Sequence, residues 1–320
     1  MSPTLQEPLP DFLQHLLAQM SEISAQQRNK GFEFTPTGMR ESLDLMTRRF
    51  VTQAPDLPFT RDTLVTGENA SDYPVPIRIY HPRPDQRLPV LVFAHGGGHV
   101  AGSVSVYELI ARKLAVASGH VLVSVDYRLA PECPYPSGLA DLRNVIRGVF
   151  ASLERLGVPH VRQLAVAGDS GGGAITASAV HDLADEEGIE IGRQLLIYPS
   201  LDYTMSSASV DSLGTGYLLE RERVAWLFKQ YFRYDENPRQ ASPLFMNLPG
   251  VYPKTMVVTA GYCPLRDEGL AYVERLEGAG FEVENLHFPN MIHAFLNLED
   301  LVPEECATFY QKVGAFLQGP

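Results

Sequence analysis

A serine between glycines is the residue of this chain best suited to nucleophilic chemistry. Residues 168–172 read Gly-Asp-Ser-Gly-Gly and follow the short apolar stretch Leu-Ala-Val-Ala at 164–167. A Gly-x-Ser-x-Gly sequence between a strand and a helix forms a sharp turn, which holds the serine Oγ clear of the backbone. Gly168 and Gly172 suit such a turn, because a Cβ at either position would collide with nearby backbone. We therefore predict that Ser170 is a nucleophile.

Hydrogen-bond donors are also needed for the negative oxygen that forms when a serine attacks a carbonyl group. Gly171 follows the nucleophile, and its N–H is placed to be one such donor. Residues 95–98 read His-Gly-Gly-Gly after another apolar stretch, and glycines let N–H groups turn toward a substrate carbonyl. We expect His95 to organise this loop by hydrogen bonding. His99 either lines the pocket or is an ordinary loop residue.

The base that takes the serine proton is predicted to be His293. It lies late in the chain, in the stretch Asn-Met-Ile-His-Ala-Phe at 290–295, just after the last predicted strand. This position fits a chain order of nucleophile, acid and histidine. His287 falls inside that strand, and we expect it to have a packing role.

Strands and helices alternate from about residue 60, and they must position these side chains. Apolar runs predict strands at 75–80, 90–94, 121–125, 164–167, 195–198, 256–259 and 283–288. Helix-length segments lie between most of them, such as 107–118, 138–156 and 173–184. Continuously apolar strands that alternate with helices are typical of an α/β fold with a mostly parallel, doubly wound sheet. Ligands bind at the carboxyl ends of such strands, where the motifs lie.

Two regions fall outside this alternation. Apolar stripes before the first strand predict two amphipathic helices, which either cover the mouth of the site or pack on the flank of the sheet; the stripes are Phe12, Leu13, Leu16, Leu17, Met20 and Ile23, then Met39, Leu43, Met46 and Phe50. Residues 200–250 hold turns and a further amphipathic helix around 220–232, and an insertion of this length suits a lid. We expect Trp226 and Tyr231 of that helix to shape the substrate pocket.

Four blocks together resemble the bacterial hormone-sensitive-lipase-like esterases, across nearly the full length of the chain. They are His-Gly-Gly-Gly at 95–98, Asp-Tyr-Arg-Leu-Ala-Pro-Glu at 126–132, Gly-Asp-Ser-Gly-Gly at 168–172 and Ile-His-Ala-Phe at 292–295. The resemblance implies an α/β-hydrolase fold with a helical cap, built from N-terminal helices and an insertion after the sixth strand. On this basis residues 1–55 form the N-terminal part of the cap, and 56–320 form the catalytic domain with a cap insertion at about 203–250.

The same resemblance implies the roles of individual residues. Ser170 and His293 would be nucleophile and base, and Gly97, Gly98 and Gly171 would donate hydrogen bonds to the oxyanion. Members of this group mostly cleave carboxylic esters with short or medium acyl chains and use no metal or other cofactor. The chain is therefore expected to hydrolyse small-molecule esters through an acyl-serine intermediate; amidase or lactonase activity would use the same machinery.

The expected catalytic acid is absent from its usual position. In the resembled group the acid is the first residue of Asp-Pro-Leu-Arg-Asp-Glu-Gly, and residues 263–269 here read Cys-Pro-Leu-Arg-Asp-Glu-Gly. Cys263 therefore stands at the position of the acid. The sequence leaves open a ligand-binding protein of the same fold, with impaired turnover, as an alternative function.

Several interpretations of Cys263 compete. The triad can be incomplete, and loss of the acid in other serine hydrolases lowers turnover by roughly 10⁴ without abolishing it. A second carboxylate can substitute, either Asp267 one helical turn later or Asp202 beyond a strand end. Cys263 itself can carry negative charge, as a thiolate beside the imidazolium or as a sulfinate after oxidation. We favour these interpretations in the order given, since a bare thiol orients a histidine poorly. The remaining interpretation is that an engineered or spontaneous substitution put cysteine at this position.

Composition limits the partners and the compartment. The net charge of −12 disfavours nucleic acid and anionic membrane surfaces, which attract basic patches. The cysteines are too few and too scattered for a disulfide framework or a zinc knuckle; they are Cys133, Cys263 and Cys306. The N-terminus lacks the pattern of a secretory signal, and no apolar run approaches the roughly 20 residues that span a bilayer. We expect a cytoplasmic protein, and the sequence leaves open whether it forms a homodimer.

Overall fold

Eight strands form one mixed sheet in the computed structural model, which describes residues 5–29, 31, 33–67 and 73–319. The sheet order is β1-β2-β4-β3-β5-β6-β7-β8. Strands β4, β3, β5, β6, β7 and β8 run parallel, while β2 pairs antiparallel with both β1 and β4. The strands are β1 Phe59–Val65, β2 Val75–His81, β3 Leu88–Ala94, β4 Val121–Val125, β5 His160–Asp169, β6 Ile191–Ile197, β7 Lys254–Tyr262 and β8 Val283–Ile292. The predicted α/β fold with a mostly parallel sheet is confirmed.

The edge strand β1 is missing from the strands predicted by apolar runs, the first of which lies at 75–80. Its sequence is Phe-Thr-Arg-Asp-Thr-Leu-Val, and only its last residue is buried. Asp62 of β1 lies opposite Arg78 of β2, and their side chains form an ion pair. Charged residues on a solvated edge strand are common, because they discourage pairing with other chains. An apolar pattern cannot detect such a strand.

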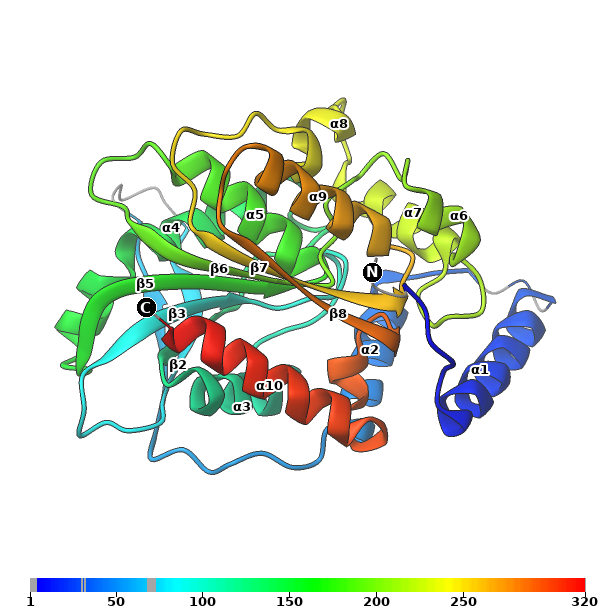
Figure 1. Ribbon diagram of the computed structural model, residues 1–320, viewed down its shortest axis with the longest axis horizontal. Coiled ribbons are helices and arrows are strands. Elements are labelled where there is room, and N and C mark those ends of the chain that lie inside the picture. The colour runs from blue at the N-terminus through cyan, green and yellow to red at the C-terminus, as the bar shows by residue number, and fades with distance from the viewer. Residues whose placement is uncertain (1–4, 30, 32, 68–72, 320) are drawn as a thin grey trace.

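Helices cover both faces of the sheet (Figure 1). Helices α3 (Glu108–Ser118) and α10 (Pro303–Gln318) lie on one face, and α4 (Ser137–Arg155), α5 (Gly171–Leu183) and α9 (Arg266–Gly278) lie on the other. Alternate side chains of β3 enter the two cores: Leu91 and Phe93 join the cluster with α3 and α10, and Val90 and Val92 join the cluster with α4 and α5. Burial on both faces explains why the central strands are continuously apolar.

The remaining helices gather at the end of the sheet toward which β7 and β8 point (Figure 1). Helices α1 (Asp11–Asn29) and α2 (Pro36–Phe50) precede the sheet; residues 1–4 of the predicted N-terminal part lie outside the described residues. Between β6 and β7 the chain forms α6 (Ala208–Ser212), α7 (Arg221–Tyr231), α8 (Pro238–Ala241) and the 3₁₀ turn η1 (Pro243–Phe245), and a second 3₁₀ segment, η2 (Phe295–Leu301), follows β8. Every helix in the described ranges is too short or too polar to cross a bilayer.

Local sequence explains where α2 begins. The Thr35 side chain accepts a hydrogen bond from the Gly38 N–H at 3.1 Å, and Pro36 occupies the first helical position, where its missing N–H costs nothing. Further along α2, Arg40 donates to the carbonyl oxygens of Val100 and Ala130. This side chain therefore ties α2 to the loop that follows β3.

Candidate active site

Ser170 stands on the tight turn between β5 and α5. Its φ of 53° and ψ of −119° are unusual for a residue with a side chain. The turn requires glycine on both sides: a Cβ on Gly168 would come within 2.3 Å of the Gly172 carbonyl oxygen, and one on Gly172 within 2.2 Å of the Ala94 carbonyl oxygen. The Ser170 N–H donates to the Ile197 carbonyl of β6 at 2.9 Å. Neighbouring strands thus hold the serine in a conformation it would not adopt by itself.

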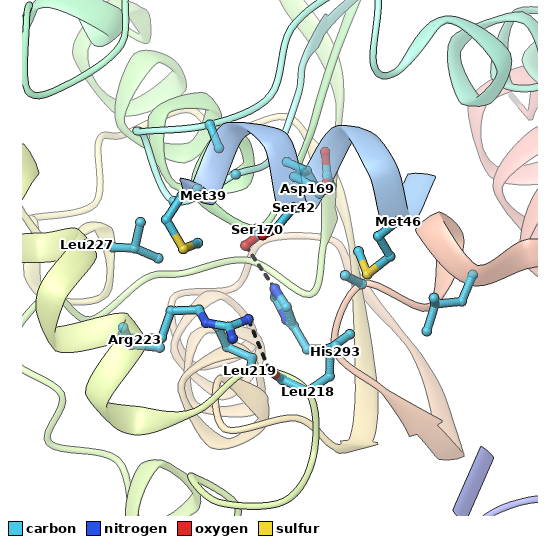
Figure 2. Close-up of a pocket in the computed structure, with 18 of the residues that line it drawn as sticks. Met39, Ser42, Met46, Asp169, Ser170, Leu218, Leu219, Arg223, Leu227 and His293 are labelled. Atoms are coloured by element: carbon cyan, nitrogen blue, oxygen red, sulfur yellow. Dashed lines mark hydrogen bonds between the residues drawn. The ribbon is translucent and has the colours of Figure 1, made fainter. Parts of the chain in front are cut away.

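His293 lies directly after β8 and is within reach of Ser170 (Figure 2). The Ser170 Oγ and the His293 Nε2 are 2.9 Å apart, a distance for hydrogen bonding and proton transfer. The imidazole is buried, and it forms a T-shaped contact with the Tyr198 ring, with ring centroids 4.9 Å apart. The structure therefore brings together two residues that lie far apart in the sequence and that we predicted as nucleophile and base.

Cys263 occupies the other side of the same imidazole. It follows the end of β7, and its Sγ lies 3.1 Å from the His293 Nδ1. The Leu265 N–H donates to this sulfur at 3.3 Å, and the side chain is 1% exposed. A group at this ring nitrogen fixes the tautomer and orientation of the histidine in a serine triad. Cys263 therefore has the position of the third triad member, with one backbone donor already directed at it.

Burial keeps both members of this pair uncharged at neutral pH. Desolvation raises the pKa of the Cys263 thiol far above its ordinary value. Desolvation also lowers the pKa of His293 to about 3. A neutral, buried thiol is also a poor target for oxidation, which proceeds through the accessible thiolate. These electrostatics oppose both the thiolate and the sulfinate interpretations of Cys263.

The two carboxylates considered as substitutes bond elsewhere. Asp267 pairs with the Arg266 guanidinium at 2.8 Å, and Asp202 accepts hydrogen bonds from the backbone N–H groups of Thr204 and Ser206 at 2.8 and 2.9 Å. Within the described ranges, the hydrogen bonds of His293 go to Ser170 and Cys263. The structure does not bring Asp267 or Asp202 to the base, because each is held by groups next to it in the sequence.

The glycines of the 95–98 loop lie beside the nucleophile. Gly97, Gly98 and Gly171 line the same cavity as Ser170 and His293. A Cβ on Gly171 would lie 3.2 Å from the Gly98 nitrogen, so the two backbone segments are nearly in contact. Gly97 and Gly98 have φ values of 118° and 61°, which glycine adopts without strain. The three predicted oxyanion donors are therefore grouped around one point next to Ser170.

Asp169 holds this loop, and the sequence reasoning missed its role. Its carboxylate accepts the Gly96 N–H at 2.6 Å and the Tyr107 O–H at 3.0 Å. Burial raises the pKa of Asp169 to about 7. The Gly-Asp-Ser-Gly-Gly motif must be buried, and a charged side chain inside it needs hydrogen-bond partners. The aspartate of this motif was therefore the signal available in the sequence. On the other side of the loop the Tyr127 O–H donates to the His95 carbonyl at 2.7 Å.

The cavity in front of Ser170 has a volume of about 540 Å³ and an apolar lining (Figure 2). Helix α1 contributes Leu16, Met20 and Ile23, α2 contributes residues that include Met39, Leu43 and Met46, and the insertion contributes Leu218, Leu219 and one face of α7. Both N-terminal helices and the insertion therefore surround the space that a substrate would enter. A cavity of this size suits a small organic molecule.

The face of α7 at the cavity differs from the one predicted. Arg223, Val224, Leu227 and Phe228 line it, whereas Trp226 and Tyr231 do not. Trp226 packs near Phe34 with ring centroids 5.8 Å apart, and Tyr231 stacks on His99 at 3.8 Å. Trp226 and Tyr231, which we expected to shape the substrate pocket, are thus not among the residues that line the cavity, because the apolar pattern located the helix without fixing its rotation.

His99 lines the cavity and also packs against residues behind the cavity wall. Its buried ring lines the cavity, and its Nε2 lies 3.1 Å from the Tyr203 hydroxyl. His95 holds its own loop through a contact of 2.8 Å between its Nδ1 and the Gly96 carbonyl oxygen. His287 lies in β8, as expected, with its Nδ1 2.8 Å from the Thr259 Oγ1.

Known proteins are similar to this chain in sequence and in architecture. The model of a family described as alpha/beta hydrolase fold matches residues 91–297. The carboxylesterase NlhH of Mycobacterium tuberculosis is 37% identical over 237 residues, which cover 72% of this chain and 73% of that protein. An ethyl acetate hydrolase of Pseudomonas putida is 32% identical over 236 residues, covering 72% and 74%. The solved structure of a hyperthermophilic esterase from Pyrobaculum calidifontis matches with a TM-score of 0.85 at 31% identity and covers 98% of each chain.

Proposed function

The chain belongs to the α/β-hydrolase family, among the hormone-sensitive-lipase-like carboxylesterases, and from this premise we propose that it cleaves short- to medium-chain esters through an acyl intermediate on Ser170. The hydrogen bond of 2.9 Å between the Ser170 Oγ and the His293 Nε2 is the observation that supports this most directly. Both residues line a 540 Å³ apolar cavity, which suits an acyl chain of this length.

Each step uses a group described above. His293 Nε2 takes the hydroxyl proton as the Ser170 Oγ attacks the ester carbonyl, and the N–H groups of Gly97, Gly98 and Gly171 bind the oxyanion. His293 then gives its proton to the departing alcohol, which leaves an acyl-serine. Water attacks this acyl group with His293 as base, and the carboxylic acid leaves with Ser170 restored. The sum is one ester and one water giving one alcohol and one acid.

We further propose that Cys263 orients His293 without stabilising its charge. The Nδ1–H would donate to the neutral sulfur, which leaves Nε2 free to accept the serine proton. The imidazolium that forms in each step would then have no anion beside it, unlike that of a complete triad. Turnover is therefore expected to be lower than in relatives with a carboxylate at this position.

Labelling with a 4-nitrophenyl alkylphosphonate tests the proposed nucleophile. We expect one phosphonyl adduct on the peptide that contains Ser170, because an activated serine attacks phosphorus and the product resembles the tetrahedral intermediate. Ser170→Ala should take up no label, while Ser137→Ala, at the start of α4 and outside the cavity, should be labelled like the parent. Intact-mass and peptide mass spectrometry give the result. A folded parent that forms no adduct, and binds esters without cleaving them, would support the ligand-binding alternative.

The pH profile tests the state of the base. Because burial lowers the pKa of His293 to about 3, the base stays neutral and active in mildly acidic solution. We therefore expect kcat/KM for a neutral ester to change little from pH 8 down to about pH 5, whereas a histidine of ordinary pKa near 6.5 would lose most activity over this range. Circular dichroism at each pH would check that the fold persists. Asp169 holds the loop beside Ser170 and has a pKa raised to about 7, so the same profile is measured for Asp169→Asn, which cannot ionise at this position. A loss of activity centred near pH 6.5 in both proteins, with the fold intact, would contradict the proposed state of His293.

A further inference from the structure

Arg223 brings a guanidinium into the apolar cavity in front of Ser170. Figure 2 shows the side chain extending from α7 toward Leu218, and both residues line the cavity. Its one hydrogen bond in the described part of the chain is a long one, 3.4 Å from Nη1 to the Leu218 carbonyl oxygen. Its Cζ also lies 5.8 Å from the centre of the Phe34 ring. The buried Nε–H has no partner among the described residues.

No carboxylate neutralises this cation by direct contact within the described ranges. Glu220 attracts it from the preceding turn, but burial has the larger effect and lowers the pKa of Arg223. Asp169, a carboxylic acid that does line the cavity, uses its two oxygens to accept from Gly96 and Tyr107. Arg221, only two residues away from Arg223, instead forms a surface ion pair with Asp211 at 3.0 Å.

An arginine in this situation has unused binding capacity. A guanidinium has five N–H donors in a planar fork that matches the two oxygens of a carboxylate. Removing such a charge from water is costly unless a partner replaces the lost hydration. The Leu218 carbonyl and the Phe34 ring replace only part of the lost hydration of the guanidinium. A second cation, Arg49, lies among the residues that line the same cavity and adds to its positive potential.

We propose that Arg223 binds a carboxylate carried by the substrate, so that the preferred esters combine an apolar chain with one terminal anionic group. Monoesters of aliphatic dicarboxylic acids, or acyl esters of hydroxy acids, have this chemistry. The chain between the two groups would pack on apolar residues of the lining such as Met39, Leu219 and Leu227. This assignment rests on the proposed ester hydrolysis, for which it names the substrate class.

Matched ester pairs test the proposal with the full-length protein. Monomethyl suberate and methyl octanoate differ by a carboxylate on the acyl side, and 6-acetoxyhexanoate and hexyl acetate differ by one on the alcohol side. We expect kcat/KM to be at least about 10-fold higher for the charged member of one pair, as charge-assisted hydrogen bonds in a desolvated site allow. Arg223→Gln should remove this preference, so that the ratio of kcat/KM between the charged and the neutral member falls to about one.

Two variants separate binding from support of the fold. Arg223→Lys should keep part of the preference, because it retains a charge without the bidentate fork. Arg221→Gln removes a cation that lies on the same helix but outside the cavity, and this variant should keep the full preference for the charged ester. A parent that cleaves both members of each pair equally, or an Arg223→Gln variant with lower melting temperature and an unchanged preference, would overturn the proposal and leave ester hydrolysis standing. A parent that cleaves no ester and takes no phosphonate label would instead refute the proposed function itself.

Discussion

Replacing Cys263 by aspartate is expected to raise kcat/KM for a short-chain aryl ester by roughly 10- to 100-fold. The Sγ lies 3.1 Å from the His293 Nδ1, so a carboxylate oxygen at this position would accept the Nδ1–H and stabilise the imidazolium formed during acylation. The Leu265 N–H that now donates to sulfur would help to hold the carboxylate. The expected effect is below the roughly 10⁴-fold effect of the acid elsewhere, because the surroundings of position 263 accommodate a neutral thiol, on which the Leu265 N–H is the one backbone donor in the described ranges.

The pH profile of this variant gives a second readout that a change in stability would not produce. An anion near a histidine favours the protonated ring, so the pKa of His293 should rise from its lowered value. The acid limb of kcat/KM should therefore move to higher pH in Cys263→Asp. Cys263→Asn has nearly the same shape without the charge, and we expect it to be no faster than the parent. A folded Cys263→Asp variant with the parent's rate and pH profile would show that Cys263 does not stand in the place of the acid.

The positions of the proposed nucleophile and base could be predicted because each depends on information local to a motif. The glycines around Ser170 report a turn that no other residue could form, and His293 follows the last strand in the expected chain order. The protonation state of Cys263 could not be predicted in the same way. The protonation state depends on burial by residues from many elements. A solvent-exposed thiol at this position would have supported the thiolate interpretation.

Long-range contacts account for the other features that could not be predicted from the sequence. Asp169 lies inside the most obvious motif, but its partners Gly96 and Tyr107 are 73 and 62 residues away in the sequence. The apolar pattern of 220–232 predicted a helix, yet the choice of Arg223 rather than Trp226 for the cavity depends on how that helix packs. Periodicity reports that a helix has an apolar side, and tertiary packing decides what that side covers.

Asp169→Ala is expected to lower kcat by about 100-fold, close to the effect of losing an oxyanion donor. The carboxylate accepts the Gly96 N–H and the Tyr107 O–H, so its removal leaves two buried donors without partners beside the loop of Gly97 and Gly98. The donors of that loop would no longer be held at the position where the oxyanion forms. Steady-state kinetics and the rate of phosphonate labelling measure the effect, and a thermal melt shows whether the variant folds. A folded variant with the parent's kcat would mean that the Asp169 carboxylate is not needed to hold the loop.

Asp169→Asn separates the hydrogen bonds of this residue from its charge. The amide oxygen can still accept from Gly96, and the amide nitrogen can donate to the Tyr107 hydroxyl, so we expect kcat within about 10-fold of the parent. Burial raises the pKa of Asp169 from 3.8 to about 7, so the folded protein favours the protonated form. The parent should therefore lose stability relative to Asp169→Asn as the pH rises from about 4 to 7, because ionisation in the folded state is penalised over this range. Melting temperatures of the two proteins across this range check the sign, and a parent that gains stability relative to the variant would show that the buried carboxylate is stabilised as an anion.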